Sequence, residues 1–463
     1  MFIGRKAELH FLKDKYEADG GQLVVIYGRR RIGKTETILE FCKGKDYIYY
    51  ACTEQADAMQ LEMFSQSVLQ KGHPAAKYLK KFSSWREAFA SLEELSGKRK
   101  KLIVIDEFPY MVKGNPEIPS VLQNLWDTTL RHLNVMLILC GSSMSFMEKE
   151  ILGEKNPLYG RTTGILKMLP MNFYEASQFF PNYSPEDRIK AYAIVGGIPH
   201  YLKQFDPAVP LGQNIIRQIL TRGSILYSEV EFLLRQELRE PGNYNTIIQA
   251  IALGNTQLND IYQKTQIEKT KLSAYLGNLM ELGIVYREFS VEAPVKEQAN
   301  TQRGLYQLTD YYFRFWYRYV FPYLSELEAG DAEAIWQYAV EPDIDFYTSY
   351  AFEDICRQYL RKLNQEGRLP FHFTKIGRWW NKTGELDIMA LDTAKQHLLL
   401  GECKFKNSMM EKRDFEAMKQ KLNVAKDIRT YYWLFAKGGF SPALAEVAKE
   451  EEDVTIVTLE EIV

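Results

Sequence analysis

The chain has 463 residues, of which 46% are hydrophobic and 25% charged, and its formal net charge is −2. This length exceeds what one hydrophobic core usually serves, so we expect several domains, and the nearly neutral charge excludes a global field that draws the chain onto nucleic acid. Five scattered cysteines predict reduced thiols, with neither a disulfide nor a zinc site. Because no apolar run approaches the ~20 residues of a membrane span, we expect a cytoplasmic protein without membrane contact.

The first predicted elements surround a phosphate-binding loop. Residues 22–41 have the pattern of a buried strand, a loop with two glycines and an amphipathic helix that begins at Lys34. The loop completes the pattern G-x-x-x-x-G-K-T with Gly28, Gly33, Lys34 and Thr35. Its backbone N–H groups can surround phosphate, Lys34 can reach the terminal phosphates, and the Thr35 hydroxyl can bind Mg²⁺. We therefore predict that the chain binds a nucleoside triphosphate, most simply ATP with Mg²⁺.

Two further apolar strands are predicted to end at the same site. The run KKLIVI ends in Asp106 and Glu107, where Asp106 would hold Mg²⁺ through water and Glu107 would be the general base for the attacking water. The run VMLILCG ends in Ser142 and Ser143, either of whose hydroxyls could sense the γ-phosphate, although a simple turn is the alternative. Arg161 could stabilise phosphoryl charge within the chain or toward a neighbouring subunit of a homo-oligomer, and a surface arginine is nearly as good an explanation.

Jointly, these segments resemble the archaeal-type ATPase family, a branch of the AAA+-like and signal-transducing (STAND-like) P-loop ATPases. The resemblance implies that the amino-terminal segment lies near the adenine, that Arg161 is an arginine finger or sensor, and that Pro199 lies where a helical lid touches the base. The matching pieces are Phe2-Ile3-Gly4-Arg5 with Glu8, the glycine loop, Ile105-Asp106-Glu107, Gly141-Ser142-Ser143, the segment 157–161 and Gly196-Gly197-Ile198-Pro199.

After an ATPase core in residues 1–170, the next two predicted domains are helical. Residues 171–238 have a helical pattern interrupted by prolines, which suits a helical lid. Residues 239–325 contain three helical segments followed by two strands, the order of a winged helix-turn-helix. The aromatic run at 311–323 is expected to form a buried or interface helix rather than a base-stacking platform.

DNA is a candidate partner of the predicted winged helix. Lys269 and Lys271 would begin its third helix, where residues that contact the DNA groove lie, and Arg287 and Arg303 would lie on its wing. Nearby glutamates offset these charges. A spacer that keeps the fold without touching DNA is therefore the alternative.

The carboxy-terminal segments GELDIMALD and HLLLGECKF predict a β-hairpin. A turn that is symmetric about the bond between Ala394 and Lys395 would place Asp387 opposite Glu402 on one face, with Glu385 opposite Lys404. Two opposed carboxylates repel, so a divalent metal, Mg²⁺ or Mn²⁺, could neutralise them while Lys404 positions a water. The alternative is a Glu385–Lys404 salt bridge on a solvated face.

This arrangement resembles the D-x(n)-E-x-K motif of restriction-endonuclease-like folds, and the resemblance extends to residues 376–387 and to a preceding helix with Glu353. The family's partner domain at this place is the domain of unknown function 234, covering residues 335–463. A nuclease activity is what this resemblance implies.

The expected fold class is α/β: a P-loop NTPase parallel sheet with a helical lid, a winged helix-turn-helix, and a carboxy-terminal α/β restriction-endonuclease-like domain. The leading functional hypothesis is ATP hydrolysis coupled to DNA binding or processing, with a metal-dependent nuclease tail. The alternative is a nucleotide-gated, STAND-like switch that uses bound nucleotide to set assembly, with the tail as a binding module only.

Overall fold

The computed structural model describes residues 2–95, 97, 99–238, 241–294, 296, 304–382, 384–425 and 427–463. It divides into two units, one of Met1–Pro170 with Ile198–His200 and the other of Met171–Gly197 with Tyr201–Val463. The predicted wing residue Arg303 lies outside the described residues. Within the described ranges, no helix is long and apolar enough to cross a membrane.

The first unit is built on a five-stranded parallel sheet with the strand order β2-β3-β4-β1-β5. Every residue of β1, β3 and β4 is buried, which explains their nearly uninterrupted hydrophobic sequence. Because the strands are parallel, the segments that follow β1, β3 and β4 meet at one edge of the sheet. The strands are β1 (Gln22–Tyr27), β2 (Tyr47–Ala51), β3 (Lys101–Asp106), β4 (Val135–Gly141) and β5 (Gly164–Lys167).

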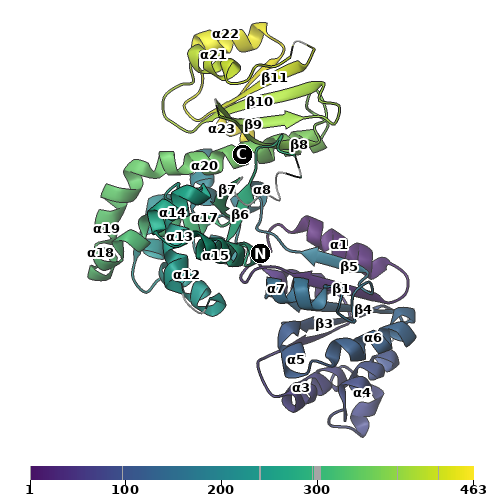
Figure 1. Ribbon diagram of the computed structural model, residues 1–463. Helices are drawn as coiled ribbons and strands as arrows, with labels where there is room; N and C mark the ends of the chain where they lie inside the picture. Colours follow the sequence, from purple (N-terminus) through teal and green to yellow (C-terminus); the bar gives the residue numbers. More distant parts are fainter. Residues whose placement is uncertain are drawn as a thin grey trace. The chain divides into compact units, whose positions relative to one another are not determined.

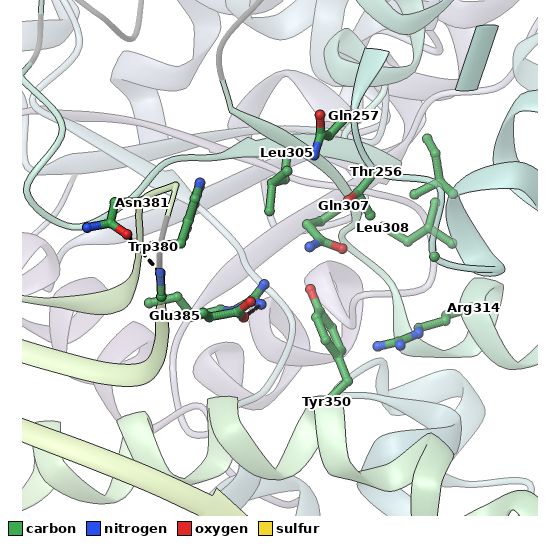
Figure 2. Close-up of a pocket in the computed structure, with 14 residues that line it drawn as sticks. Thr256, Gln257, Leu305, Gln307, Leu308, Arg314, Tyr350, Trp380, Asn381 and Glu385 are labelled. Atoms are coloured by element: carbon green, nitrogen blue, oxygen red, sulfur yellow. Dashed lines mark hydrogen bonds and ion pairs between the residues drawn. The ribbon is translucent and has the colours of Figure 1, made fainter. Parts of the chain in front are cut away.

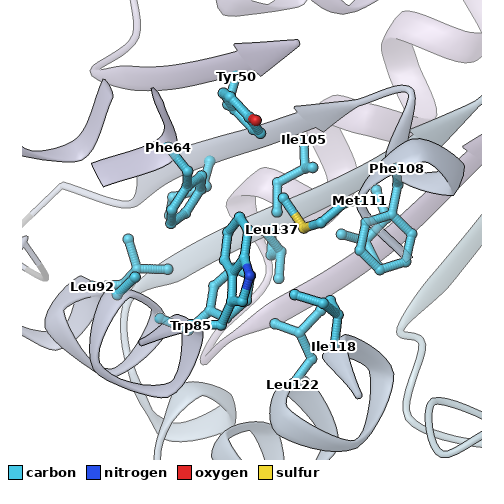
Figure 3. Close-up of a cluster of buried hydrophobic side chains, with 14 of the residues drawn as sticks. Tyr50, Phe64, Trp85, Leu92, Ile105, Phe108, Met111, Ile118, Leu122 and Leu137 are labelled. Carbon is cyan, nitrogen blue, oxygen red and sulfur yellow. The ribbon is translucent and has the colours of Figure 1, made fainter. Parts of the chain in front are cut away.

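Helices cover both faces of this sheet, with α3 to α6 on one side and α1 on the other (Figure 1). The core between the sheet and α3 to α6 contains Phe64, Trp85 and Ile105 (Figure 3). The Trp85 indole N–H donates to Asp57 Oδ1 over 2.7 Å, so the buried ring keeps a polar partner. The helices are α1 (Lys6–Glu17), α2 (Lys34–Cys42), α3 (Asp57–Leu69), α4 (Trp85–Ala90), α5 (Phe108–Gly114), α6 (Ile118–Thr128) and α7 (Met144–Phe146).

The second unit begins with helices, as the sequence predicts for its first part. Three of them, α13, α14 and α15, precede a two-stranded antiparallel hairpin of β6 and β7. These elements are α8 (Phe173–Ala176), α9 (Pro185–Val195), α10 (Pro199–Leu202, which begins in the first unit), α11 (Leu211–Ile215), α12 (Ile225–Glu237), α13 (Pro241–Ala252), α14 (Leu258–Thr265), α15 (Lys269–Glu281), β6 (Val285–Glu288) and β7 (Leu305–Leu308).

The aromatic run forms helix α17 (Tyr311–Tyr319), and six of the seven aromatic rings of this helix are buried, as predicted. The Trp316 indole N–H donates to the Tyr227 carbonyl over 2.8 Å, and the Tyr317 hydroxyl donates to Asn245 Oδ1 over 2.7 Å. These bonds join α17 to α12 and α13, so the rings serve packing within this unit. After α17 come α18 (Leu324–Ala329), α19 (Ala332–Ile335) and the long α20 (Ile344–Gln365).

The carboxy-terminal part is a mixed five-stranded sheet with the order β12-β11-β10-β9-β8. Strands β8, β9 and β10 are antiparallel neighbours, whereas β10, β11 and β12 run parallel. Figure 1 shows α20 on one side of this sheet and α21 with α22 on the other. The elements are β8 (Lys375–Trp380), β9 (Glu385–Leu391), β10 (His397–Lys404), α21 (Lys412–Gln420), β11 (Arg429–Ala436), α22 (Pro442–Glu450), β12 (Val454–Val457) and α23 (Leu459–Ile462).

The β9–β10 hairpin has the predicted register. Leu398 pairs with Leu391 and Gly401 pairs with Ile388, which are the partners that a turn symmetric about the Ala394–Lys395 bond requires. The residues one step beyond the last of these pairs are Asp387 and Glu402.

Candidate functional site

The phosphate-binding loop joins β1 to α2, and each of the two glycines of its pattern is required for a different structural reason. A Cβ on Gly28 would lie 2.5 Å from the Met168 carbonyl oxygen, so only glycine lets the loop leave β1 here. Gly33 precedes α2 with a φ of 89°, in the left-handed region that favours glycine. A Cβ on Gly33 would also lie 3.5 Å from Pro199 Cγ, which places Pro199 beside the start of α2.

Lys34 occupies the interior of this loop. Its Nζ donates to the Gly28 carbonyl over 2.9 Å and to the Arg29 carbonyl over 3.0 Å, and the residue is 6% exposed. Burial lowers the pKa of Lys34, while nearby groups that include Glu107 and Asp106 oppose the shift. An incoming phosphate would therefore replace carbonyl partners of a lysine that is already in place.

Oxygen atoms from α2 and β3 meet at the sheet edge. Thr35 Oγ1 donates to Asp106 Oδ2 over 2.7 Å, and the Tyr49 hydroxyl of β2 donates to the same oxygen. A hydroxyl and a carboxylate in contact are the hard oxygen donors that Mg²⁺ prefers. The residues present therefore fit the ion that accompanies ATP, and Tyr49 is a second support of Asp106 that the sequence did not reveal.

Glu107 follows directly and is held by Ser142 after β4. The Ser142 hydroxyl donates to Glu107 Oε2 over 2.8 Å, and the Ser142 backbone N–H approaches the same oxygen at 3.3 Å. Glu107 has a φ of 51°, in the left-handed region, at the point where β3 ends and α5 begins. The predicted base and one of the two predicted sensor serines are thus hydrogen-bonded to each other.

Arg5, expected near the adenine together with Ile3 and Gly4, links three segments of the first unit. Its guanidinium donates to Glu8 over 2.8 Å, to the Leu169 carbonyl over 2.7 Å and to the Ile32 carbonyl over 2.8 Å. Only 2% of the side chain is exposed. Arg5 therefore connects the phosphate-binding loop to the segment after β5, which gives it a structural task in the chain.

Arg161 makes a bidentate contact in the chain. Its Nε and Nη2 donate to the Asp127 carboxylate, with Nη2 to Oδ2 at 2.8 Å, and Nη1 donates to the Pro157 carbonyl over 3.0 Å. The pKa of Asp127 is lowered by its hydrogen bonds to Arg161. Acting on a nucleotide would require Arg161 to release Asp127, so the structure does not bring it together with Lys34 and Glu107 as a preformed set.

In the second unit, Asp387 and Glu402 lie near Glu353 of α20. Burial raises the pKa of Glu402 to about 7, with the Asp387 charge as the next cause, and burial and Asp387 likewise raise the pKa of Glu353 to about 8. The pKa of Asp387 is also raised, mainly by burial, although its Oδ2 accepts the Cys403 N–H over 2.8 Å. Burial and the charge of Asp387 therefore act in the same direction on Glu402 and Glu353, and both favour the protonated forms of these groups.

The lysine that contacts this group is Lys421, after α21. Its Nζ donates to both oxygens of Glu402 at 2.8 Å. Lys404 instead pairs with Asp414 at 2.9 Å, and Glu385 pairs with Arg378, so the alternative of a Glu385–Lys404 salt bridge is wrong. Among the residues that the structure describes, no three His, Cys, Asp or Glu side chains are arranged to hold a metal ion.

Comparisons with known proteins match two parts of the chain to family models. Residues 2–205 match an "ATPase domain predominantly from Archaea". Residues 316–418 match the domain of unknown function 234, described as "Archaea bacterial proteins of unknown function".

Individual relatives extend these matches. An uncharacterized protein of Methanocaldococcus jannaschii is 34% identical over 445 residues, which is 94% of this chain and 96% of the relative. A protein of the same organism called an uncharacterized ATP-binding protein is 47% identical over 45 residues, covering 10% of this chain and 76% of the relative. The structure of a Walker-type ATPase of Pyrococcus abyssi covers 68% of this chain and 96% of its own, with a TM-score of 0.52 and 21% identity, which shows a likeness of fold.

Proposed function

Because the chain belongs to the family of archaeal-type P-loop ATPases that carry the domain of unknown function 234, we propose that Glu107 is the general base of its ATP hydrolysis. The observation that supports this most directly is the 2.7 Å contact of Thr35 with Asp106 beside Glu107, at the edge where the phosphate-binding loop ends. Mg²⁺ bound there would neutralise phosphate charge. Lys34 then exchanges the Gly28 and Arg29 carbonyls for phosphate oxygens, and Glu107 accepts the proton of the attacking water.

ATP turnover of the full chain tests this assignment. Glu107→Gln should bind ATP with unchanged affinity and hydrolyse it at least ~100-fold more slowly, the usual scale for loss of a general base. The matched control is Glu117→Gln, an exposed glutamate before α6 that makes no contact with this site. Wild-type turnover in Glu107→Gln would show that the base lies elsewhere.

A nucleotide-gated switch is the second candidate, and the Ser142 contact is the observation that favours it. A carboxylate that is held by a hydroxyl and a backbone N–H is restrained from reaching water. If Ser142 orients the base, Ser142→Ala lowers kcat by about 10-fold with little change in KM. If Ser142 instead keeps Glu107 in an inactive position, Ser142→Ala hydrolyses ATP faster than the wild type, which would favour the nucleotide-gated switch.

Coupling to DNA is proposed through α13 to α15 and the β6–β7 hairpin, which together have the element order of a winged helix. Lys269 and Lys271 at the start of α15 are exposed. Lys269 lies over the Tyr262 ring at 5.0 Å and Lys271 lies 4.0 Å from Glu268, exposed contacts that a phosphate could replace. Arg287 is half-buried over the Phe289 ring at 4.8 Å, so we assign it to packing. Lys269→Ala should weaken duplex binding and flatten its salt dependence, since each phosphate contact contributes to the slope. An unchanged slope in the double Lys269→Ala, Lys271→Ala variant would contradict DNA contact by this helix.

For the carboxy-terminal sheet we propose metal-dependent nuclease chemistry at Asp387 and Glu402. The supporting observation is the predicted register of the β9–β10 hairpin, which brings Asp387 opposite Glu402. Burial and the Asp387 charge raise the pKa of Glu402, and a divalent cation would remove that cost of ionisation. Cleavage of labelled DNA in Mn²⁺ should be lost in Asp387→Asn. Comparing Lys404→Ala with Lys421→Ala then identifies the lysine that acts, because only Lys421 contacts Glu402. Cleavage that persists in Asp387→Asn would refute the proposal.

A further inference from the structure

A pocket of about 610 Å³ lies within the second unit, whereas the phosphate-binding loop belongs to the first. Its wall is formed by the α13–α14 junction, β7, α17, α20, the end of β8 and the start of β9. Figure 2 shows Arg314, Tyr350, Trp380 and Gln307 converging on it from four of these elements. The volume is in the range of small-molecule sites, which are ~300–1,000 Å³.

The charges of the lining favour an anion. Two arginines and one glutamate line the pocket, but Arg378 is neutralised by Glu385 and by Glu288 at 3.1 Å. Arg314 is half-buried and stacks over the Tyr350 ring at 3.8 Å. Among the described residues, no carboxylate lies within ion-pair distance of the Arg314 guanidinium. A partly desolvated cation without a counter-charge is costly, and an anionic ligand would remove that cost.

The rest of the wall combines a flat aromatic surface with amide groups. Trp380 is half-buried and lines the pocket, and the Arg378 guanidinium lies 5.8 Å from the centre of its ring. The carboxamides of Gln257 and Gln307 lie on the facing wall, and Gln307 uses one donor on Glu288 at 3.3 Å. An aromatic face suits stacking of a planar heterocycle, and carboxamides can donate to and accept from the edge of a base.

We propose that this pocket is a second nucleotide site, with a phosphate on Arg314 and the base against Trp380. Because the Tyr350 ring packs against the planar face of the Arg314 guanidinium, the N–H groups at the edge of the guanidinium can donate to a phosphate. A free mononucleotide and the 5′-phosphorylated end of a nucleic-acid strand present the same chemistry to these groups. The site is independent of Lys34, so it stands or falls separately from the proposed ATP hydrolysis.

Calorimetric titration of the full chain tests the site after the phosphate-binding loop has been saturated with Mg²⁺ and a non-hydrolysable ATP analogue. The probes are AMP, CMP, a 5′-phosphorylated tetrathymidylate, its unphosphorylated form, and inorganic phosphate. We expect AMP, CMP or the phosphorylated oligonucleotide to bind with a Kd below ~1 mM. Arg314→Gln should weaken that binding at least ~10-fold, and Trp380→Leu about 5-fold.

The matched control is Arg318→Gln, one turn along α17, because Arg318 also lies over a tyrosine but pairs with Asp343 and does not line the pocket. Thermal midpoints of all variants establish that they fold. Binding of mononucleotides supports a free ligand, whereas binding of the phosphorylated oligonucleotide alone supports a strand end. The proposal is overturned if the wild type binds none of these probes, if inorganic phosphate binds as tightly as AMP, or if Arg314→Gln and Arg318→Gln bind alike.

Discussion

Replacing Arg5 by alanine distinguishes two possible roles of this residue, a structural role in the first unit and a contact with adenine. The side chain is 2% exposed and makes charge-assisted hydrogen bonds of 2.7–2.8 Å to Glu8 and to the Ile32 and Leu169 carbonyls. Removing one partner of such a buried set costs about 3–5 kcal/mol, because the remaining groups lose their donors in a dry environment. In a unit of this size, each kcal/mol of lost stability lowers the thermal midpoint by ~2–4 °C, so the midpoint of Arg5→Ala should fall by about 10 °C.

Differential scanning calorimetry of the full chain measures this, and the transition of the first unit is identified as the one that Mg²⁺–ATP raises. Lys6→Ala, an exposed neighbour at the start of α1, is the control and should leave the midpoint unchanged. If Arg5 only contacts adenine, Arg5→Ala weakens ATP binding without lowering the midpoint measured in the absence of nucleotide. That result would refute the structural reasoning.

Three further outcomes follow from the two sites. Lys34→Ala should abolish nucleotide binding measured by calorimetry, since it deletes the one buried ammonium in the loop. Burial raises the pKa of Glu402 to about 7 in the folded protein, so the stability that the protonated Glu402 contributes is fully present below its unfolded pKa and is lost as the pH rises. The wild type should therefore lose stability between about pH 4.5 and 7. The decline in thermal midpoint over this range should be smaller in Glu402→Gln. Millimolar Mn²⁺ should raise the midpoint of the second-unit transition in the wild type but not in Asp387→Asn, and an equal rise in both would exclude Asp387 as a ligand.

Local patterns predicted the elements that depend on local physics. The glycine loop requires backbone that only glycine adopts at Gly28 and Gly33, and the three buried strands have hydrophobic sequences because both faces are covered. The β9–β10 register followed from alternation and the turn between Ala394 and Lys395, since a slip of one residue would expose the apolar face. The burial of helix α17 was predicted because its sequence is a nearly continuous run of aromatic residues.

The contacts that sequence reasoning missed are those between segments far apart in the chain. Tyr49 reaches Asp106 because β2 and β3 are neighbours in the sheet, and Lys421 reaches Glu402 because α21 packs on the hairpin. No spacing rule links such pairs. Arg5 was predicted to lie near the adenine by resemblance alone. Its hydrogen bonds to two backbone carbonyls depend on how the phosphate-binding loop and the segment after β5 fold, and a pattern of side chains does not predict such backbone positions.

The place of β1 in its sheet has a consequence for biosynthesis. Gln22 of β1 pairs with Met136 of β4, and Val24 pairs with Gly164 of β5, so both neighbours of this strand are translated long after it. A nascent chain that has passed the glycine loop therefore carries an apolar strand with two open edges, a state prone to aggregation. Non-local parallel pairing is also slow to form. Met168, whose N–H donates to the Tyr27 carbonyl over 2.7 Å beside the loop, is also translated long after it, so the loop is expected to reach its final shape late in the folding of this unit.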